Sequence, residues 1–190
     1  MIIGVDEVGR GCMAGPVVAG AVILDRRIRG LKDSKQLIKA ERERLDVIIR
    51  KRAVAYGLGW ASHQEIDEFG LTQAVRLAMQ RAVAELQGQY QEAAREVQEI
   101  IIDGNYNFLK ELPGSRAVVR ADDTVAAVSA ASIIAKVARD NYMIQMAEQY
   151  PGYNFESHVG YCTPGHRKAL LELGMCELHR RSFAPVRAIL

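Results

Sequence analysis

Cysteine is scarce in this sequence, and its scarcity argues against a disulfide scaffold. Only Cys12, Cys162 and Cys176 occur among 190 residues, and they are odd in number and far apart. Small secreted proteins that depend on disulfides carry an even and denser set of cysteines. We therefore expect reduced thiols.

A long hydrophobic run is also lacking. The longest charge-free apolar stretch, Cys12 to Leu24, has 13 residues and is interrupted by two glycines and a proline. A membrane-spanning helix needs about 20 apolar residues. Asp6 and Glu7 come before any basic region or cleavage site, unlike the start of a signal peptide. These absences predict a cytoplasmic protein.

The composition carries no bias toward disorder, internal repeats or coiled coils. Hydrophobic residues make up 49% and charged residues 25%, close to globular averages. A chain of 190 residues has the length of one domain. We expect residues 1–190 to form a single domain, with a helical segment over about 150–190.

The charge is distributed unevenly. The formal net charge is +2, but residues 1–60 carry +5, residues 61–112 carry −5 and residues 113–190 carry +2. Basic ends around an acidic middle are compatible with a polyanionic partner, although this pattern alone is weak support.

Hydrophobic periodicity predicts alternating strands and helices, and so an α/β protein. Short apolar runs predict strands over residues 2–8, 16–24, 54–60, 97–103 and 116–121. Helices are expected over residues 38–52, from 62 to 86 with a break at Gly70, over 124–149, and from Pro164 to Gly174. Ser62 to Glu65 matches a capping box, and Thr163 is a helix cap followed by proline. We expect residues 87–95 to form a polar connection between the helix that ends near residue 86 and the strand over residues 97–103.

Acidic residues interrupt or end three of the predicted strands. They are Asp6 and Glu7, Asp103, and the pair Asp122 and Asp123. If these strands are neighbours, carboxylates crowd together and need protons or cations to coexist, and Mg²⁺ or Mn²⁺ suits such oxygen ligands. The alternative is ordinary turn residues and a helix cap. Because adjacent strand residues point to opposite faces, Asp6 and Glu7 can share a site only near an edge, at a bulge or through the longer glutamate arm.

A Gly9-Arg10-Gly11 segment follows the first acidic pair. Glycines permit positive φ angles and let the backbone approach a ligand closely, which suits a sugar or phosphate contact. Taken alone, the segment is equally a common turn.

The sequence closely resembles bacterial ribonuclease HII, of the type 2 ribonuclease H family, because a series of motifs matches in the same order over nearly the whole chain. The matching segments are Gly4 to Gly11, Ala14 to Val18, Asp33 to Leu37, Asp103 to Asn105, Ala131 to Lys136, Tyr150 to Tyr153, Gly160-Tyr161 and His179 to Pro185. The resemblance implies a ribonuclease H-like fold, with a central mixed β-sheet flanked by helices and a C-terminal helical segment that contacts substrate. It also implies a metal-dependent endonuclease for RNA–DNA hybrids that cuts 5′ of single ribonucleotides embedded in DNA, leaves 3′-hydroxyl and 5′-phosphate ends, and serves ribonucleotide excision repair.

The same resemblance assigns site residues. Four acids match the family's catalytic and metal-binding positions, with Mg²⁺ or Mn²⁺ as cofactor and two ions during catalysis: Asp6, Glu7, Asp103 and Asp122. The elements that sense the 2′-hydroxyl and the junction to deoxyribose match Gly9, Arg10, Gly11 and Tyr161. The 2′-hydroxyl is the group that distinguishes RNA from DNA at a site, and Tyr161 offers a flat ring and a hydroxyl; alternatively it covers the core.

Further polar residues are candidates for phosphate contacts. Ser34 and Lys35 precede a predicted helix, whose N-terminus with a nearby cation suits a phosphate, or they are a plain cap and a solvated lysine. Lys136 and Arg139 lie one turn apart on the long helix, where either pairs with the acids or contacts phosphate. The sequence leaves these two roles open.

The chain departs from the usual family pattern without losing a proposed ligand. The departures are Cys12, Met13, Ala121, Thr124 and Cys162. They put substrate preference in question more than catalysis.

Three alternatives compete with this interpretation. Zinc binding by Cys162, His166, Cys176 and His179 has unusual ligand spacing and is less favoured than a packed C-terminal helix. The related ribonuclease HIII carries an additional N-terminal domain, for which this chain leaves no room. A hybrid-binding module without catalysis requires a broken set of acids. We expect a monomer without a membrane partner, and residues 186–190 contain no convincing sliding-clamp motif.

Overall fold

The computed structural model describes residues 1–89 and 97–189, and a five-stranded mixed sheet forms its centre. The strands are β1 (Ile2–Val8), β2 (Val17–Ile23), β3 (Ala55–Ala61), β4 (Glu99–Asp103) and β5 (Ser115–Val118), in the spatial order β3-β2-β1-β4-β5. The first three strands are antiparallel, whereas β1, β4 and β5 are parallel. The carboxyl ends of β1 and β4 therefore lie at the same edge of the sheet.

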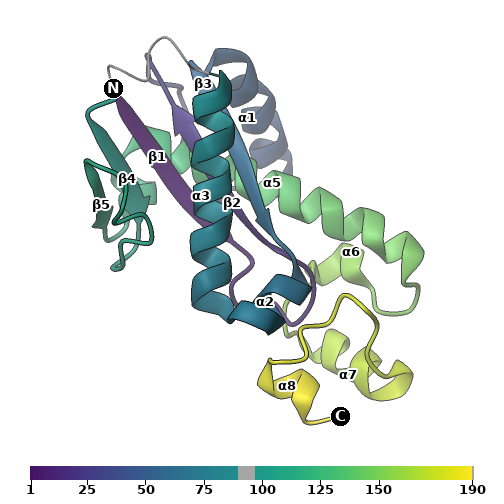
Figure 1. The fold of residues 1–190 in the computed structure, drawn as a ribbon. Coiled ribbons are helices and arrows are strands. Elements are labelled where there is room, and N and C mark those ends of the chain that lie inside the picture. The colour runs from purple at the N-terminus through teal and green to yellow at the C-terminus, as the bar shows by residue number, and fades with distance from the viewer. Residues whose placement is uncertain (90–96, 190) are drawn as a thin grey trace.

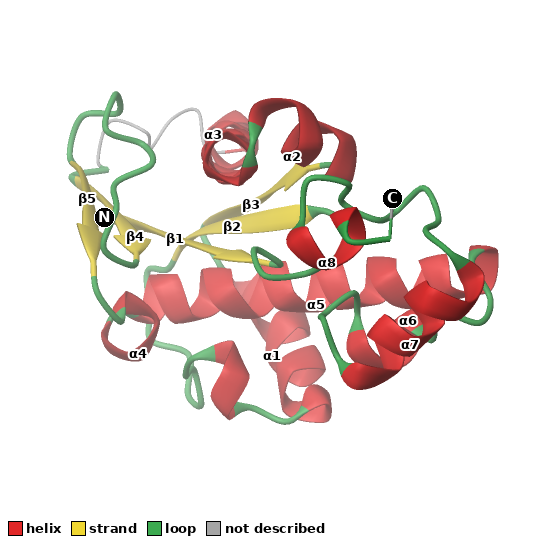
Figure 2. Cartoon of the chain, turned by 90° about the horizontal axis from the view of Figure 1, so that it is seen from below, coloured by secondary structure: helices red, strands yellow, loops and turns green. Residues whose placement is uncertain are grey.

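Helices cover both faces of this sheet. Figures 1 and 2 show α2 and α3 on one face and α1 and α5 on the other, with the C-terminal helices grouped at one end. The helical elements are η1 (Ser34–Gln36), α1 (Lys39–Arg52), α2 (His63–Phe69), α3 (Leu71–Gln89), α4 (Ala121–Thr124), α5 (Ala126–Gln149), α6 (Phe155–His158), α7 (Pro164–Leu173) and α8 (Ala184–Arg187). This arrangement confirms the predicted fold class.

Helix α5 packs unusually closely on the sheet because two strand positions lack a side chain. A Cβ added at Gly4 of β1 would lie 2.2 Å from a backbone atom of Ala127, and one at Gly20 of β2 would lie 2.4 Å from the Ala131 carbonyl oxygen. The small residues of α5 meet these glycines. The helix is thereby fixed directly against the middle strands, beside Asp6.

Most predicted elements are confirmed, and the differences have local causes. The strand expected over 116–121 spans Ser115–Val118 instead, because Arg120 adopts a left-handed conformation (φ 59°) and Ala121 begins α4. The helix expected from residue 124 begins at Ala126, after the extended Val125. Residues 87–89 continue α3 instead of starting a connection, and the remainder of that predicted connection falls outside the described residues.

The C-terminal segment packs against the loop between β1 and β2. Two isolated β-bridges join them, one between Cys12 and Tyr161 and one between Ala14 and His179. The predicted cap of α7 is confirmed, because the Thr163 hydroxyl accepts the His166 amide. All three cysteines are free, as expected.

Among residues 1–89 and 97–189, no helix combines the length and apolar character that crossing a bilayer requires.

Candidate active site

Asp6 lies on β1 and faces α5. Residues two apart on a strand share a face, and Gly4 already contacts α5, so Asp6 points the same way. Its side chain is almost completely buried, with 6% exposure. Burial raises the pKa of Asp6 well above its ordinary value, and the charge of Glu7 adds to this, while a hydrogen bond from Ser132 acts in the opposite direction. An uncompensated carboxylate here is therefore unfavourable.

Asp103 closes β4 and organises the start of α4. Its Oδ1 accepts the backbone amide of Ala121 at 2.8 Å and that of Asp122 at 3.4 Å. A carboxylate at a helix N-terminus satisfies amides that otherwise have no partner. This contact brings Asp122 to the carboxyl end of the parallel strands.

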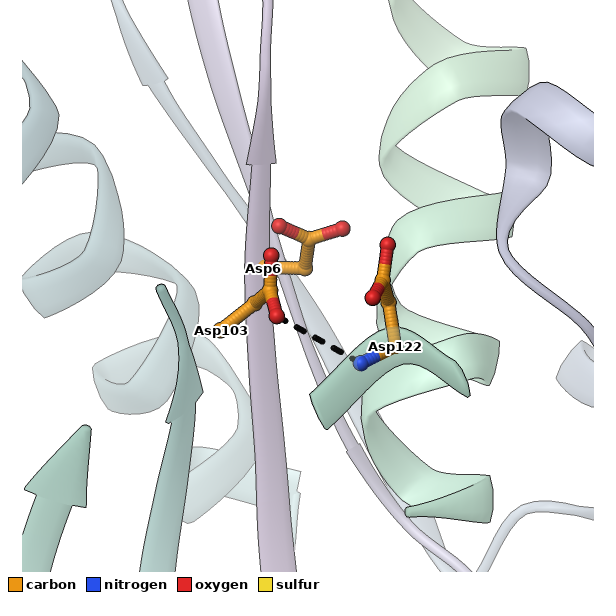
Figure 3. A group of neighbouring side chains, drawn as sticks. All are labelled: Asp6, Asp103 and Asp122. Atoms are coloured by element: carbon orange, nitrogen blue, oxygen red, sulfur yellow. Dashed lines mark hydrogen bonds between the residues drawn. The ribbon is translucent and has the colours of Figure 1, made fainter. Parts of the chain in front are cut away.

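The three aspartates converge on one point. Carboxylate oxygens of Asp6, Asp103 and Asp122 all lie within 4.8 Å of one another. Figure 3 shows the three side chains gathered between β1, β4 and α4. Burial raises the pKa of Asp122, and the neighbouring charge of Asp103 raises it further. Three oxygen ligands that repel one another fit a hard divalent cation such as Mg²⁺ or Mn²⁺.

Glu7 lies outside this group of three. The alternation of a strand turns it away from Asp6, and its Oε1 accepts a hydrogen bond from the Arg10 guanidinium at 3.0 Å. Its Oε2 is buried and has no hydrogen-bond partner among the described residues. Burial raises the pKa of Glu7, although Arg10 lowers it. A buried carboxylate oxygen without a partner is suited to binding a cation, and the charge of Asp103 is close enough to act on Glu7.

The Gly9-Arg10-Gly11 segment forms the turn that leaves β1. Gly9 has φ +93°, so its glycine is required by the backbone, whereas Gly11 has no positive φ. A Cβ at Gly11 would meet nothing within 4 Å. The absence of a side chain there leaves the surface open to a close ligand.

Tyr161 lies beside this turn, joined to it by the bridge to Cys12. Its side chain is partly exposed, at 38%. The Lys136 ammonium lies 5.3 Å from its ring centroid and the Arg139 guanidinium 5.9 Å away. Tyr161 therefore presents an aromatic surface in a positively charged setting.

Ser34 and Lys35 differ in their surroundings. The Ser34 hydroxyl is buried and lies 2.9 Å from the hydroxyl of Ser132, which itself contacts Asp6. This geometry connects Ser34 to Asp6 through Ser132. Lys35 is exposed. Partial desolvation opposes the charge of its ammonium, but attraction by Asp33, Asp6 and Asp122 raises its pKa. The cap of this short helix is Asp33, not Ser34.

The roles of Lys136 and Arg139, which the sequence left open, are separated by the structure. Lys136 pairs with Asp140 at 2.8 Å. Arg139 is completely buried and donates to the carbonyl oxygens of Pro16, Ala14 and Val159. Neither side chain makes an ion pair with the four acids in the part of the chain that the structure describes.

Two histidines form a buried relay behind Tyr161. The Cys176 amide donates to Nδ1 of His179, the Nε2 atoms of His179 and His166 lie 3.1 Å apart, and Nδ1 of His166 lies 2.9 Å from the Tyr161 carbonyl oxygen. The Cys176 amide donates to Nδ1 of His179, so that ring carries its proton on Nε2 and donates it to Nε2 of His166. The Tyr161 carbonyl only accepts, so Nδ1 of His166 is the donor to it. Both rings are therefore neutral, and burial lowers the pKa of each to about 4.

This relay is unfavourable for the zinc alternative. The ring nitrogens face each other and the Tyr161 carbonyl instead of a shared point, and Cys162 is exposed. Among residues 1–89 and 97–189, the side chains that converge as metal ligands are the three aspartates.

Sequence reasoning missed Ser132 and Arg180 as supporting residues and left the role of Arg139 open. Ser132 and Arg139 are buried polar side chains of α5, and polar residues on the buried side of an alanine-rich helix were a usable signal. Arg180 is fully buried, and its guanidinium donates to carbonyl oxygens in the loop between β1 and β2. No local pattern marks it, because its partners lie about 165–171 positions away.

The fold and the acid cluster define a class, the hydrolases of the ribonuclease H-like fold. Comparison with known proteins narrows this class. The family model of ribonuclease HII matches residues 3–186. Ribonuclease HII of Nitrosococcus oceani is 50% identical over 191 residues, covering 100% of this chain and 91% of that protein. The chain therefore belongs to the ribonuclease HII family, hydrolytic endonucleases that act on the RNA strand of RNA–DNA hybrids.

Solved structures agree with this assignment. The crystal structure of ribonuclease H2 from Pyrococcus horikoshii has a TM-score of 0.78 at 27% identity, and the match covers 99% of this chain and 96% of that one. The ribonuclease HII in a complex with PCNA from Archaeoglobus fulgidus has a TM-score of 0.76 at 26% identity, covering 95% and 92%.

Proposed function

We propose that this chain cuts the RNA strand of hybrids and also cuts 5′ of single ribonucleotides embedded in duplex DNA, leaving 3′-hydroxyl and 5′-phosphate ends. The observation that carries the proposal is the convergence of Asp6, Asp103 and Asp122 at the edge of the sheet. The Gly9–Gly11 turn and Tyr161 supply a second element from which ribose can be recognised. Because the site draws on residues from 6 to 161, we propose that residues 1–190 act as one catalytic domain.

Asp6, Asp103 and Asp122 would hold Mg²⁺ or Mn²⁺, with Glu7 contributing through the buried Oε2 that has no partner among the described residues. When bound, a divalent ion supplies polarisation of the phosphate and activation of the attacking water. The carboxylates of this chain act as ligands, and the proposal includes no side-chain nucleophile.

The remaining residues bind and orient the substrate. Lys35 is suited to binding a backbone phosphate, because its ammonium is close enough to the acids for their charges to favour its protonated form. Backbone atoms of the Gly9–Gly11 turn are suited to the 2′-hydroxyl, and the Tyr161 ring is suited to the adjoining sugar. Ser34 stays in this proposed set as the neighbour of Lys35, and its hydroxyl also pairs with that of Ser132.

The decisive experiment compares two end-labelled substrates, a duplex with one embedded ribonucleotide and a long RNA–DNA hybrid. Each is incubated with Mg²⁺, Mn²⁺ or a chelator. We expect incision 5′ of the single ribonucleotide, and we expect the chelator to abolish it.

A matched pair of variants tests the acid cluster in the same assay. Asp122→Asn removes a proposed ligand, whereas Asp123→Asn changes the next residue, whose carboxylate bonds Gln36. We expect loss of cleavage only in Asp122→Asn. Cleavage of the long hybrid alone would refute the ribose-sensing roles of Gly9–Gly11 and Tyr161, and no cleavage of either substrate would favour a binding module.

A further inference from the structure

Arg180 is a buried cation whose guanidinium donates its hydrogen bonds to backbone carbonyls and lies over the ring of Phe183. Its side chain is 0% exposed, and its Nε donates to the Gly15 carbonyl at 2.9 Å. Its Nη1 donates to the Arg10 carbonyl at 3.0 Å and its Nη2 to the Gly9 carbonyl at 2.7 Å. Within the described residues it makes no salt bridge with a carboxylate. A guanidinium that is expensive to bury is therefore used to hold three peptide groups.

The same loop is held by a second buried arginine. Arg139 donates to the carbonyls of Ala14 and Pro16, and a Cβ at Gly9 would lie 2.3 Å from its Nε. Gly9 is thus in direct contact with one guanidinium and hydrogen-bonded to the other. The turn that leaves β1 therefore packs against the guanidinium groups of two buried arginines, Arg139 and Arg180.

The hydrogen bonds to Arg180 determine which way the turn's amides point. In a trans peptide the C=O and the following N–H point in opposite directions, and no peptide bond in the described parts of the chain is cis. Because the carbonyls of Gly9 and Arg10 point inward to Arg180, the amides of Arg10 and Gly11 point outward. Both residues are exposed, and Gly11 has no side chain to cover them. Two adjacent outward N–H groups form a receptor for an oxygen acceptor.

We propose that Arg180 is a positioning residue for ribose recognition, which orients the Arg10 and Gly11 amides toward the 2′-hydroxyl by fixing the Gly9 and Arg10 carbonyls. The proposal rests on the proposed function, because it assigns a ribose to the receptor. Arg180 does not touch the substrate and acts through the peptide groups that it holds.

Arginine is required for this role because of its shape. Three donors at fixed angles reach three separate carbonyls, and a lysine ammonium on a flexible stem cannot reproduce this planar geometry. The backbone around Arg180 is also fixed. Its amide donates to the Met13 carbonyl, and the Asp67 carboxylate accepts the amides of Arg181 and Ser182.

The test uses the full chain and compares Arg180→Lys with Arg181→Lys, a matched change at the adjacent, exposed position. Dissociation constants are measured in Ca²⁺ for a duplex with one ribonucleotide and for the all-DNA duplex of the same sequence. We expect Arg180→Lys to lower the preference for the ribonucleotide by about tenfold, the scale of two lost hydrogen bonds. Its affinity for the all-DNA duplex and its Mn²⁺ binding stay at the wild-type level, and Arg181→Lys keeps the preference.

Other outcomes overturn the proposal. It is wrong if folded Arg180→Lys keeps the wild-type preference, or if it loses affinity for both duplexes equally. If Arg180→Lys does not fold, Asp67→Ala decides, because it releases the segment after Arg180 from the surface; we expect a smaller loss of preference, and an unchanged preference contradicts the proposal. Failure of the proposed function is separate, since it appears as absence of cleavage by the wild-type protein.

Discussion

At the residue scale, Asp6 combines membership of the aspartate cluster with an unfavourable environment. Its carboxylate is buried beside two other acids, and burial raises its pKa. We predict that Asp6→Asn stabilises the metal-free protein by about 1–2 kcal/mol, the scale of a single stabilising substitution at a functional site. Asparagine keeps an acceptor for the Glu7 amide while removing the charge. Urea unfolding in the presence of a chelator measures this change.

The same variant should lose turnover by about a thousandfold, because losing metal-assisted charge stabilisation removes several kcal/mol from the transition state. Hybrid binding should survive, because phosphates are held by basic residues and not by Asp6. Cleavage kinetics and a binding assay separate the two effects. Full activity in Asp6→Asn would refute the role of the cluster.

Residue types and strand ends were sufficient to predict the acids, because a carboxylate inside an apolar run is conspicuous. They were insufficient for Ser34, whose hydroxyl is paired with a residue 98 positions away. They were also insufficient for Arg139, which faces carbonyls on another element. Where a side chain is bonded across elements, its partner depends on packing that no local pattern encodes.

At the element scale, the position of α5 depends on the absence of a side chain at Gly20. We predict that Gly20→Ala destabilises the fold by about 1–3 kcal/mol or more, because its Cβ would lie 2.4 Å from the Ala131 carbonyl oxygen. Activity should fall as well, since Ser132 on α5 supports Asp6. Denaturant unfolding and cleavage rates measure both.

Gly88→Ala is the matched control for this prediction. Gly88 lies on α3, and a Cβ there would meet nothing within 4 Å. Alanine in a helix is favoured over glycine by up to about 1 kcal/mol, so this variant should be slightly stabilised. Equal destabilisation of both variants would argue against close packing as the cause.

Long elements with a clear period were predicted well, and short ones were not. The ranges of β1, α1 and α7 agree closely with expectation, because the apolar spacing of each is clear and α7 also has the Thr163 cap. Helices α6 and α8 have four residues each, too few to establish a period. The start of α4 directly after β5 depends on the left-handed Arg120, and arginine is not a residue type that predicts such a conformation.

At the scale of the whole molecule, the neutral histidine relay makes stability depend on pH. The pKa of both His166 and His179 is about 4 in the folded protein, against 6.5 for an ordinary histidine. Below pH 6.5 the unfolded chain binds protons that the folded chain does not. This stabilising contribution is therefore complete above pH 6.5 and is lost as the pH falls toward 4.

We predict that His179→Asn lowers stability at pH 7 but gives a shallower decline between pH 6.5 and pH 4. Each such histidine accounts for a slope of at most about 1.4 kcal/mol per pH unit. Urea unfolding at several pH values measures the slopes. The raised pKa values of Asp6 and Glu7 make stability increase as the pH falls, which is the opposite dependence. The wild-type protein and the His179→Asn variant both contain these acids, so the difference between their slopes reports His179. Identical slopes would show that the relay does not titrate.

The charge distribution predicts how the whole molecule meets its substrate. The net charge is only +2, so attraction must come from local basic groups such as Lys35. We predict that hybrid affinity falls linearly with salt on logarithmic axes, with a slope of about −0.9 for each phosphate contact in a B-form duplex. Titrations across salt concentrations measure this slope. An affinity independent of salt would contradict phosphate-mediated binding.

The loop between β1 and β2 is joined by β-bridges to the C-terminal segment, which is the last part of the chain to be synthesised. Asp122 leaves the ribosome 58 residues before Arg180. The three aspartates are therefore all present in a nascent chain whose Gly9–Gly11 turn still lacks the guanidinium that orients it. On the inference above, the capacity to hold metal precedes the capacity to tell ribose from deoxyribose, and selectivity is the last property that the growing chain acquires.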